Sequence, residues 1–358
     1  TMGKRNGKKS AATLDPGCDP KILYNNYLQS CRCIGIEPSP SLKSALTNED
    51  SPNRGVQIII VGEENNVLGP GGCRALVNAM IGKIDDSDAI KHPFTATKDL
   101  RIVRSRIKDG GAIAISTLLF ATARRKSVNT ALKGDSLNQP EWQMEYLELM
   151  DNDIGRDGAM ALGRSLSVGM NTTLRSLVLD FNRTLASDGV AALCKGLATN
   201  STLKKLSLKH CGIDEKGGSP LSKMLQFKKL GLILLDLTGN SLGAVGLADL
   251  CVGLLNNSSL TTLRLAENSI GRSEEDMKSL KIFADVLSKN TSLTAIDLLH
   301  NRIGSEGGAV LLPSIKGSAQ ITDFKVDANM DDEIYKSLFK MSISKNTVKK
   351  KKSSKKHK

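Results

Sequence analysis

One pattern recurs along most of the chain and constrains its fold more than any other feature. The pattern reads L-x-L-x-x-N-x-[LI]-G-x-x-G, and one complete copy runs from Leu235 to Gly246. A fixed period in which the asparagine and glycines recur at the same places indicates repeated units that stack into a solenoid. A solenoid more often offers a binding surface than a reaction site. The first apolar position of successive copies is occupied by Leu147, Leu177, Leu206, Leu235, Leu263, Ile296 and Phe324, at intervals of 30, 29, 29, 28, 33 and 28 residues.

Each copy predicts one short strand followed by one helix. The two leucines alternate with polar residues, so the strand buries one side only. The helix carries apolar residues at helical spacing, for example Leu162 and Leu166. Since one unit cannot bury its apolar faces alone, neighbours must stack, with a parallel sheet on one side and helices on the other. We expect strands near 146–149, 176–179, 205–208, 234–237, 262–265 and 295–298, and helices that start at Gly158, Gly189, Gly217, Gly246 and Gly307.

An asparagine ends each predicted strand. Its amide can bond backbone groups in its own turn and in the neighbouring repeat. Cys211 departs from the column, and a thiol is a weaker donor than an amide. A second asparagine series, at residues 171, 200, 257 and 290, matches the glycosylation sequon, but we expect it to be structural because it falls where helices end. The strand-end column reads Asn152, Asn182, Cys211, Asn240, Asn268, Asn301 and Asn329.

Long repeats with a full helix, the column of asparagine or cysteine, and the segments at 200–203, 257–260 and 290–293 resemble leucine-rich repeats of the ribonuclease-inhibitor type. The resemblance covers about residues 56–340. It implies an α/β horseshoe solenoid with a parallel sheet on the concave face and helices on the convex face. Such repeats occur in an inhibitor, Ran GTPase-activating proteins, innate immune sensors and centrosomal or ciliary proteins, so fold alone does not choose a function. Residues 23–31 and 35–38 also resemble the lead-in of some centrosomal and ciliary members.

Four segments are expected along the chain. Residues 1–19 are polar and basic and predict a disordered tail, and residues 345–358 form a lysine-rich tail. Residues 20–55 predict a helical cap, which a solenoid needs at its open end. Residues 56–344 form the repeat domain, whose first two repeats are irregular. Insertions near 82–98 and 126–142, the second with the only tryptophan, Trp142, are either functional or disordered.

The net charge of +13 lies mostly in the two tails. Residues 1–14 contribute +4 and residues 345–358 contribute +8, which leaves about +1 for the rest. The C-terminal tail has three interpretations: a nuclear import signal, a tether to RNA or to acidic protein tails, or a solubilising end. It lacks interleaved aromatic residues, so stacking on RNA bases is not supported. Its lysines include Lys349, Lys350, Lys351, Lys352, Lys355 and Lys356.

The sequence contains none of the common catalytic or metal-binding motifs. No phosphate-binding loop, dinucleotide fingerprint, zinc-ligand cluster or nucleophile elbow is found. His210 and His300 occupy the same position three repeats apart, on the order of 15 Å by strand spacing, so one metal ion cannot bridge them. We expect no metal, cofactor or small-molecule substrate. No pair among the seven cysteines has zinc-site or redox spacing, so we expect reduced thiols. No apolar run is long enough to span a membrane. We therefore expect an intracellular, cytoplasmic protein, with the cilium, centrosome or nucleus as further options.

The concave face is the candidate binding site. Residues between and after the leucines point to this face, and their charges have mixed sign, unlike a phosphate-binding stripe. Arg264 falls between Asp236 and Asp297 on adjacent strands, which predicts either an ion-pair ladder or a docking site. An outward Phe181 would serve as an anchor. The candidate residues are Glu148, Asp180, Phe181, His210, Asp236, Arg264, Glu267, Asp297, Leu299 and His300.

The sequence therefore favours a non-enzymatic adaptor that binds a protein partner on its concave face and attaches electrostatically through its basic tail. Two alternatives remain. The first is a Ran-type GTPase-activating protein, although such proteins tend to carry an acidic stretch after the repeats where this chain carries lysines. The second is a nuclear or ribosome-associated factor that the lysine tail holds on RNA.

Overall fold

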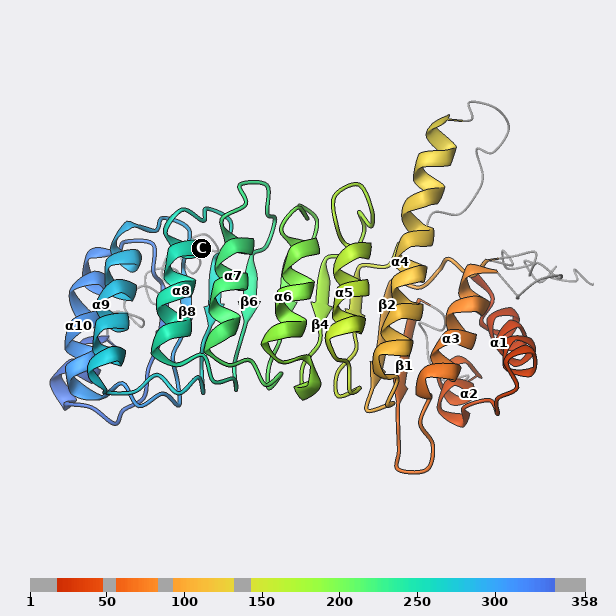
Figure 1. The fold of residues 1–358 in the computed structure, drawn as a ribbon, viewed down its shortest axis with the longest axis horizontal. Coiled ribbons are helices and arrows are strands. Elements are labelled where there is room, and N and C mark those ends of the chain that lie inside the picture. The colour runs from red at the N-terminus through yellow and green to blue at the C-terminus, as the bar shows by residue number, and fades with distance from the viewer. Residues whose placement is uncertain (1–17, 48–55, 83–92, 132–142, 339–358) are drawn as a thin grey trace, which may run out of the picture.

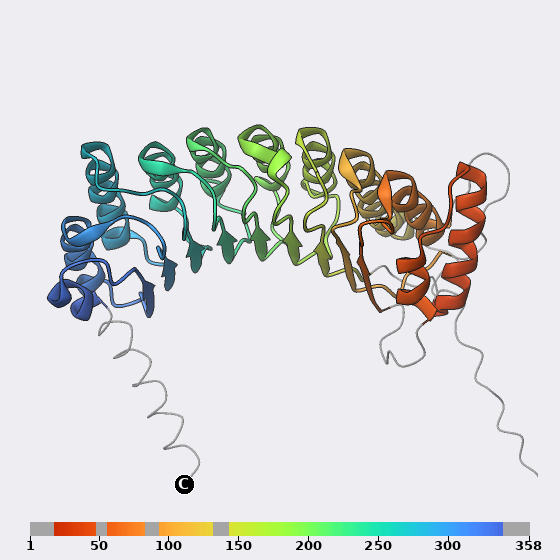
Figure 2. The same ribbon diagram turned by 90° about the horizontal axis from the view of Figure 1, so that it is seen from below.

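Nine parallel strands form one open sheet whose order follows the chain. The computed structural model describes residues 18–47, 56–82, 93–131 and 143–338. The sheet lines the inner side of an arc and the helices line the outer side (Figure 2), which confirms the predicted leucine-rich repeat solenoid. The strands are β1 (Gln57–Val61), β2 (Asp99–Val103), β3 (Tyr146–Glu148), β4 (Ser176–Val178), β5 (Lys205–Ser207), β6 (Leu234–Asp236), β7 (Thr262–Arg264), β8 (Ala295–Asp297) and β9 (Asp323–Lys325).

The register aligns the repeated leucines directly. Leu147, Leu177 and Leu206 are paired across β3, β4 and β5, and all three are fully buried. These side chains point away from the concave face and pack against the helices behind the sheet. Because the side-chain period of a strand is two, the residues between them face the opposite side. The repeated leucines therefore decide which residues line the concave surface.

Helices cover the convex side, and four of the five whose starts the sequence predicted begin two or three residues earlier, whereas the helix expected from Gly217 begins at Gly218. The glycine expected to start a helix lies within its first turns instead, as at Gly158 and Gly246, where it is buried against neighbouring elements. A Cβ at Gly158 would come within 2.9 Å of Ala112 Cβ, so this position requires glycine for close packing. The convex helices are α3 (Gly69–Ile81), α4 (Lys108–Ala131), α5 (Arg156–Ser165), α6 (Ala186–Leu197), α7 (Gly218–Leu225), α8 (Gly243–Leu255), α9 (Glu274–Lys289) and α10 (Gly304–Gly317) (Figure 1).

Two helices precede the first strand and lie at that end of the solenoid. Helix α1 (Pro20–Ile34) packs against α3, and α2 (Pro40–Thr47) packs against β1. Tyr27 of α1 is fully buried, and its hydroxyl accepts a hydrogen bond from the Ser39 backbone N–H at 3.0 Å. This contact fixes the turn between α1 and α2. The two helices therefore cover apolar surface that the first repeat would otherwise expose.

The two early insertions differ from expectation in part. Helix α4 continues to Ala131, so the beginning of the insertion near 126–142 is helical and projects beyond the neighbouring helices (Figure 1). Phe94, from the insertion near 82–98, is fully buried. Trp142, the basic N-terminal tail up to residue 17 and the lysine-rich C-terminal tail lie outside the described residues.

A ladder of buried asparagine amides closes the carboxyl ends of the strands. The Asn240 amide donates to the carbonyl oxygens of Leu208 and Leu237 at 2.9 and 2.8 Å, and its oxygen accepts from the backbone N–H groups of Cys211 and Ile213. Each amide therefore joins its own strand end to the preceding turn. Equivalent side chains at Asn152, Asn182 and Asn301 are buried and bond the same kinds of groups. Asn268 is also buried and its amide donates to the Leu237 and Ala266 carbonyls, but its side-chain oxygen has no hydrogen-bond partner among the described residues.

Cys211 takes part in the ladder by a different bond. Its thiol donates to the Leu179 carbonyl at 3.2 Å, and burial raises the pKa of this thiol to about 12. Asn329 does not continue the ladder as the sequence suggested. This residue is exposed, and its carbonyl accepts from the Arg272 guanidinium. The last repeat therefore lacks the buried turn that the preceding repeats share.

The second asparagine series is structural as well. Asn200 is buried, its oxygen accepts from the Leu203 backbone N–H at 2.7 Å, and its amide donates to the Leu166 carbonyl. Asn171, Asn257 and Asn290 are also buried. Their amide groups are bonded inside the fold, so these sequons do not offer accessible glycosylation sites.

Replacement of Asn240 by alanine should leave buried backbone groups unpaired. We expect Asn240→Ala to lower the free energy of unfolding by about 1–3 kcal/mol. Asn65→Ala is the control, because Asn65 is exposed in the irregular first repeat. Denaturant unfolding of both variants checks the prediction, and equal midpoints for Asn240→Ala and the parent chain would contradict a structural role for the ladder.

Candidate functional site

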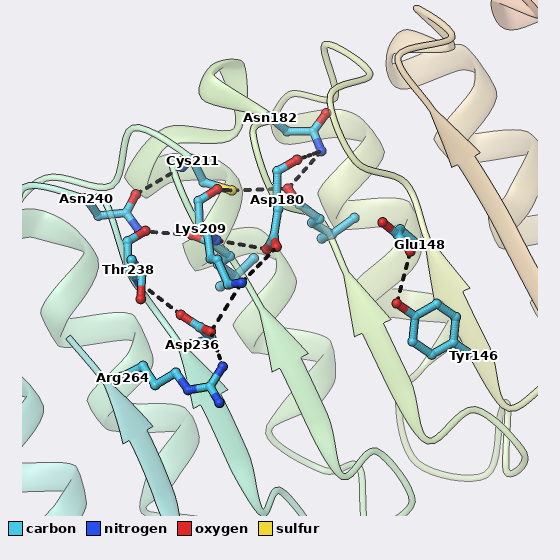
Figure 3. A network of polar contacts seen from close by, with 12 residues as sticks. Tyr146, Glu148, Asp180, Asn182, Lys209, Cys211, Asp236, Thr238, Asn240 and Arg264 are labelled. Carbon is cyan, nitrogen blue, oxygen red and sulfur yellow. Dashed lines mark hydrogen bonds and ion pairs between the residues drawn. The ribbon is translucent and has the colours of Figure 1, made fainter. Parts of the chain in front are cut away.

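A charged network crosses the middle of the concave face. The Arg264 guanidinium lies 3.0 Å from the Asp236 carboxylate, and the Lys209 ammonium lies 3.6 Å from the same carboxylate and 3.8 Å from that of Asp180 (Figure 3). The four side chains come from four successive repeats. The carboxylates are buried, whereas the side chains of Lys209 and Arg264 remain 35% and 41% exposed. The network therefore presents cations to solvent above buried anions.

This arrangement corrects two expectations. Asp180 and Asp236 are buried, so they support the surface and are poorly placed to touch a partner. Arg264 pairs with Asp236, while the nearest cation to Asp297 is Lys325, at 3.9 Å. Lys209, which sequence reasoning did not single out, links the two buried carboxylates. Its position after the second leucine of its repeat was the available signal, because that position also points to the concave face.

An aromatic pair lies beside this network at the rim. The rings of Phe181 and His210 are stacked, with centroids 4.7 Å apart and an angle of 23° between their planes. Phe181 is 43% exposed. Next along the rim, a Cβ at Gly239 would collide with the His210 ring, so glycine leaves room for the imidazole. The rim therefore carries an exposed benzyl group held in place from one side.

The backbone of the turn orients this pair. Phe181 and His210 have φ of 62° and 50°, a left-handed conformation that is unfavourable for bulky residues. Asp151, Glu267 and His300 occupy the same position in other repeats and share the conformation. The turn is held by the ladder and by the bond from the Phe181 N–H to the Lys209 carbonyl at 2.7 Å. Strain of this kind persists only when the surrounding structure fixes it.

The remaining candidates lie in two further groups. Glu148 accepts a hydrogen bond from the Tyr146 hydroxyl at 3.0 Å, and burial followed by this bond raises the pKa of Tyr146 to about 12. The Arg101 guanidinium lies over the Tyr146 ring. Glu267 and His300 are exposed and line a rim cleft of about 890 Å³ together with Arg272 and Arg302. Leu299, which follows β8 on the concave face, is half-buried.

Sequence reasoning missed the apolar beginning of the concave face. Ile59 and Val61 of β1 are 43% and 39% exposed, whereas Ile58 and Ile60 are fully buried. The alternation is visible in the sequence, but the first two repeats are irregular, so the predicted concave positions begin only after Leu147. The concave face therefore changes from apolar at β1 to charged at its centre.

Metal-ligand clusters and membrane-spanning helices are not found in the part of the chain that the structure describes. Within these residues, no group of three or more histidine, cysteine or acidic side chains is arranged to hold a metal ion. In the same residues, no helix is long and apolar enough to cross a membrane.

Neutralisation of the buried Asp236 tests the network. Asp236→Asn keeps an acceptor for the Thr238 N–H but removes the charge between Lys209 and Arg264. We expect the free energy of unfolding to fall by about 1–3 kcal/mol. Asp297→Asn is the matched control: it makes the same local bond, to the Leu299 N–H, but is partly exposed and should cost about 0–1 kcal/mol. Equal losses in thermal unfolding would show that the central network has no special weight.

Comparison with known proteins agrees with the geometry. Residues 144–163, 171–194, 199–222 and 289–312 match the family described as Leucine Rich repeat. The chain is 29% identical over 300 residues to a ribonuclease inhibitor of Mus musculus, covering 80% of this chain and 59% of that protein. It is 27% identical over 312 residues to a ribonuclease inhibitor of Sus scrofa, covering 85% and 63%.

A shorter match involves a larger protein. Over 158 residues the chain is 34% identical to NACHT, LRR and PYD domains-containing protein 12 of Mus musculus, covering 42% of this chain and 14% of that protein. The chain thus spans about three fifths of the length of the ribonuclease inhibitors that it matches. Its repeat length, its ladder and these matches identify the chain as a leucine-rich repeat protein of the ribonuclease-inhibitor type.

Proposed function

We propose that the chain is a protein-binding adaptor that takes its partner on the centre of the concave face. The observation that carries this proposal is the exposed Phe181, whose ring is stacked on His210. The backbone of Phe181 lies in a left-handed turn that the surrounding hydrogen bonds hold in place. Rigid aromatic side chains contribute strongly at protein interfaces, because they bury a large area with little loss of conformational freedom. The anchor is already ordered without a partner, which lowers the entropic cost of binding.

The neighbouring charges suggest the chemistry of the partner. Lys209 and Arg264 face solvent, while the carboxylates that compensate them lie beneath the surface. The cations are held in position by these carboxylates and still have free hydrogen-bonding capacity on the solvent side. A partner with an apolar recess for Phe181 and nearby carboxylates would complement this region. The resemblance to ribonuclease inhibitors, which by name act on another protein, supports protein binding as the general role.

Loss of the anchor and reversal of the adjacent charge test this proposal. We expect Phe181→Ala and Arg264→Glu each to weaken partner binding by about tenfold or more, corresponding to roughly 1.4 kcal/mol. The partner would be identified by affinity purification from native cells, and binding would then be measured with purified proteins by calorimetry. Raising the salt concentration should weaken binding moderately, since part of the interface is charged.

The control for this experiment is Ile282→Ala on the convex helix α9, where Ile282 is 44% exposed. This variant removes a similarly exposed apolar side chain from the opposite face and should leave the affinity unchanged. A chain without residues 345–358 should also retain the partner. Undiminished binding by the Phe181→Ala, Arg264→Glu double variant, or loss of all binding with the tail, would contradict the proposed site.

A further inference from the structure

A basic surface lies along the edge of the solenoid where helices lead back into strands. This edge faces upward in Figure 1, beside the projecting end of α4. Five cations lie in the connections to β4, β5 and β6 or at the start of β5, all exposed or partly exposed: Arg175, Lys204, Lys205, Lys228 and Lys229. We call these five residues the basic edge. The last turns of α5, α6 and α7 add Arg164, Lys195 and Lys223 nearby.

Acidic residues of the same repeats lie at the other edge. Between residues 160 and 233 the acidic side chains are Asp180, Asp188, Asp214 and Glu215. Each lies where a strand leads into a helix, at the end of β4 or at the beginning of α6 or α7. That edge also carries Arg183, Lys209 and Lys216, so its charge is nearly balanced, whereas no acidic residue of this stretch lies at the basic edge. The connection to β3 carries the acidic Glu145, so the basic edge does not extend to that connection.

The fold does not require these cations. Arg175 and Lys204 precede their strands and donate to the carbonyls of Thr202 and Gly231 in the next connection. In later repeats the neutral residues Thr294 and Thr322 take the same position, and their hydroxyls donate to carbonyls of the preceding connection, those of Thr261 and Thr294. The position therefore accepts a neutral residue with a different backbone bond, so the solenoid forms there without a cation. The positive charge of Arg175 and Lys204 needs another explanation.

The connection between α7 and β6 departs from its neighbours in the same way. Lys229 occupies the position of Asn200 and Asn257, which are buried and bonded in their connections. Here Lys229, Lys228 and Phe227 are all exposed, and Phe227 is 48% exposed. In this repeat a lysine replaces the buried asparagine, and the connection exposes one aromatic side chain followed by two cations.

Exposed apolar side chains accompany the cations along this edge. Besides Phe227, they are Ile233, which is 43% exposed, Met170, 38% exposed, and Val168, 70% exposed. Pure charge attraction would not need them. Aliphatic side chains offer little to the bases of a nucleic acid, which stack on aromatic residues, and Phe227 is the single aromatic residue among them. Alternating acidic and apolar groups would satisfy both features.

We infer that the basic edge binds an acidic segment of a partner protein in which carboxylates alternate with apolar side chains. The carboxylates would pair with Lys228, Lys229 and Arg175, and the apolar side chains would cover Phe227 and Ile233. This surface is separate from the concave face and does not depend on the function proposed there.

Binding of a short fluorescent peptide that alternates glutamate with leucine and phenylalanine tests the inference. With the full chain, Lys228→Glu combined with Lys229→Glu should weaken binding about tenfold or more, and Phe227→Ala several-fold. The charge-matched control, Lys21→Glu with Lys281→Glu, lies on α1 and α9 and should change affinity less than about twofold. Hydrogen exchange should show protection of residues 226–233 by the peptide, which separates this surface from the lysine tail.

Three outcomes would overturn the inference. The first is equal binding by the edge variant and the parent chain. The second is exchange protection that excludes the connection between α7 and β6. The third is tighter binding of fluorescent oligouridine than of the peptide, lost in the same edge variant, which would assign the surface to nucleic acid.

Discussion

Satisfaction of backbone polar groups at the carboxyl ends of the strands is the constraint on which the rest of this structure depends. A strand of three residues cannot hold its own end in place, and each turn places N–H and C=O groups in a buried environment. The asparagine amide bonds both kinds of group and joins adjacent repeats. Unpaired buried groups of this kind are costly, so the ladder fixes the turn in one conformation. That conformation is left-handed at the preceding residue, which is why Phe181, His210 and Glu267 point outward at the rim.

Much of the fold follows from the sequence because its signals are local and periodic. Six strands were predicted within one residue, since alternating leucines and a following asparagine mark them directly. Helix starts were less accurate: the glycine at Gly158 serves close packing against Ala112 of α4, and packing across repeats cannot be read from one repeat. Asn329 was misjudged for a similar reason. Asn329 matches the pattern, but it lies in the turn after β9, the last strand among the described residues. That turn is exposed, so the amide is not buried.

The candidate site was predictable in its location and less so in its detail. Periodicity indicated which residues face the concave side, but it could not tell that Asp236 is buried while Arg264 is half-exposed. Burial depends on the length and direction of neighbouring side chains, as with Lys209, which reaches over two carboxylates. The stacking of Phe181 on His210 likewise requires the distance between adjacent turns and the space left by Gly239. The basic edge was hidden in the small total charge of the repeats, because the eleven cations and four carboxylates between residues 160 and 233 are assigned to edges only by the folded chain.

Site-specific crosslinking tests the central claim most directly, which is that a partner protein docks on Phe181. A photoreactive phenylalanine analogue at position 181 should crosslink to the partner in native cells, and the same analogue at position 282 on the convex face should not. The account predicts a partner-dependent crosslink at position 181 that disappears when Arg264 is also replaced by glutamate. A crosslink of equal yield at both positions, or at position 282 alone, would contradict it.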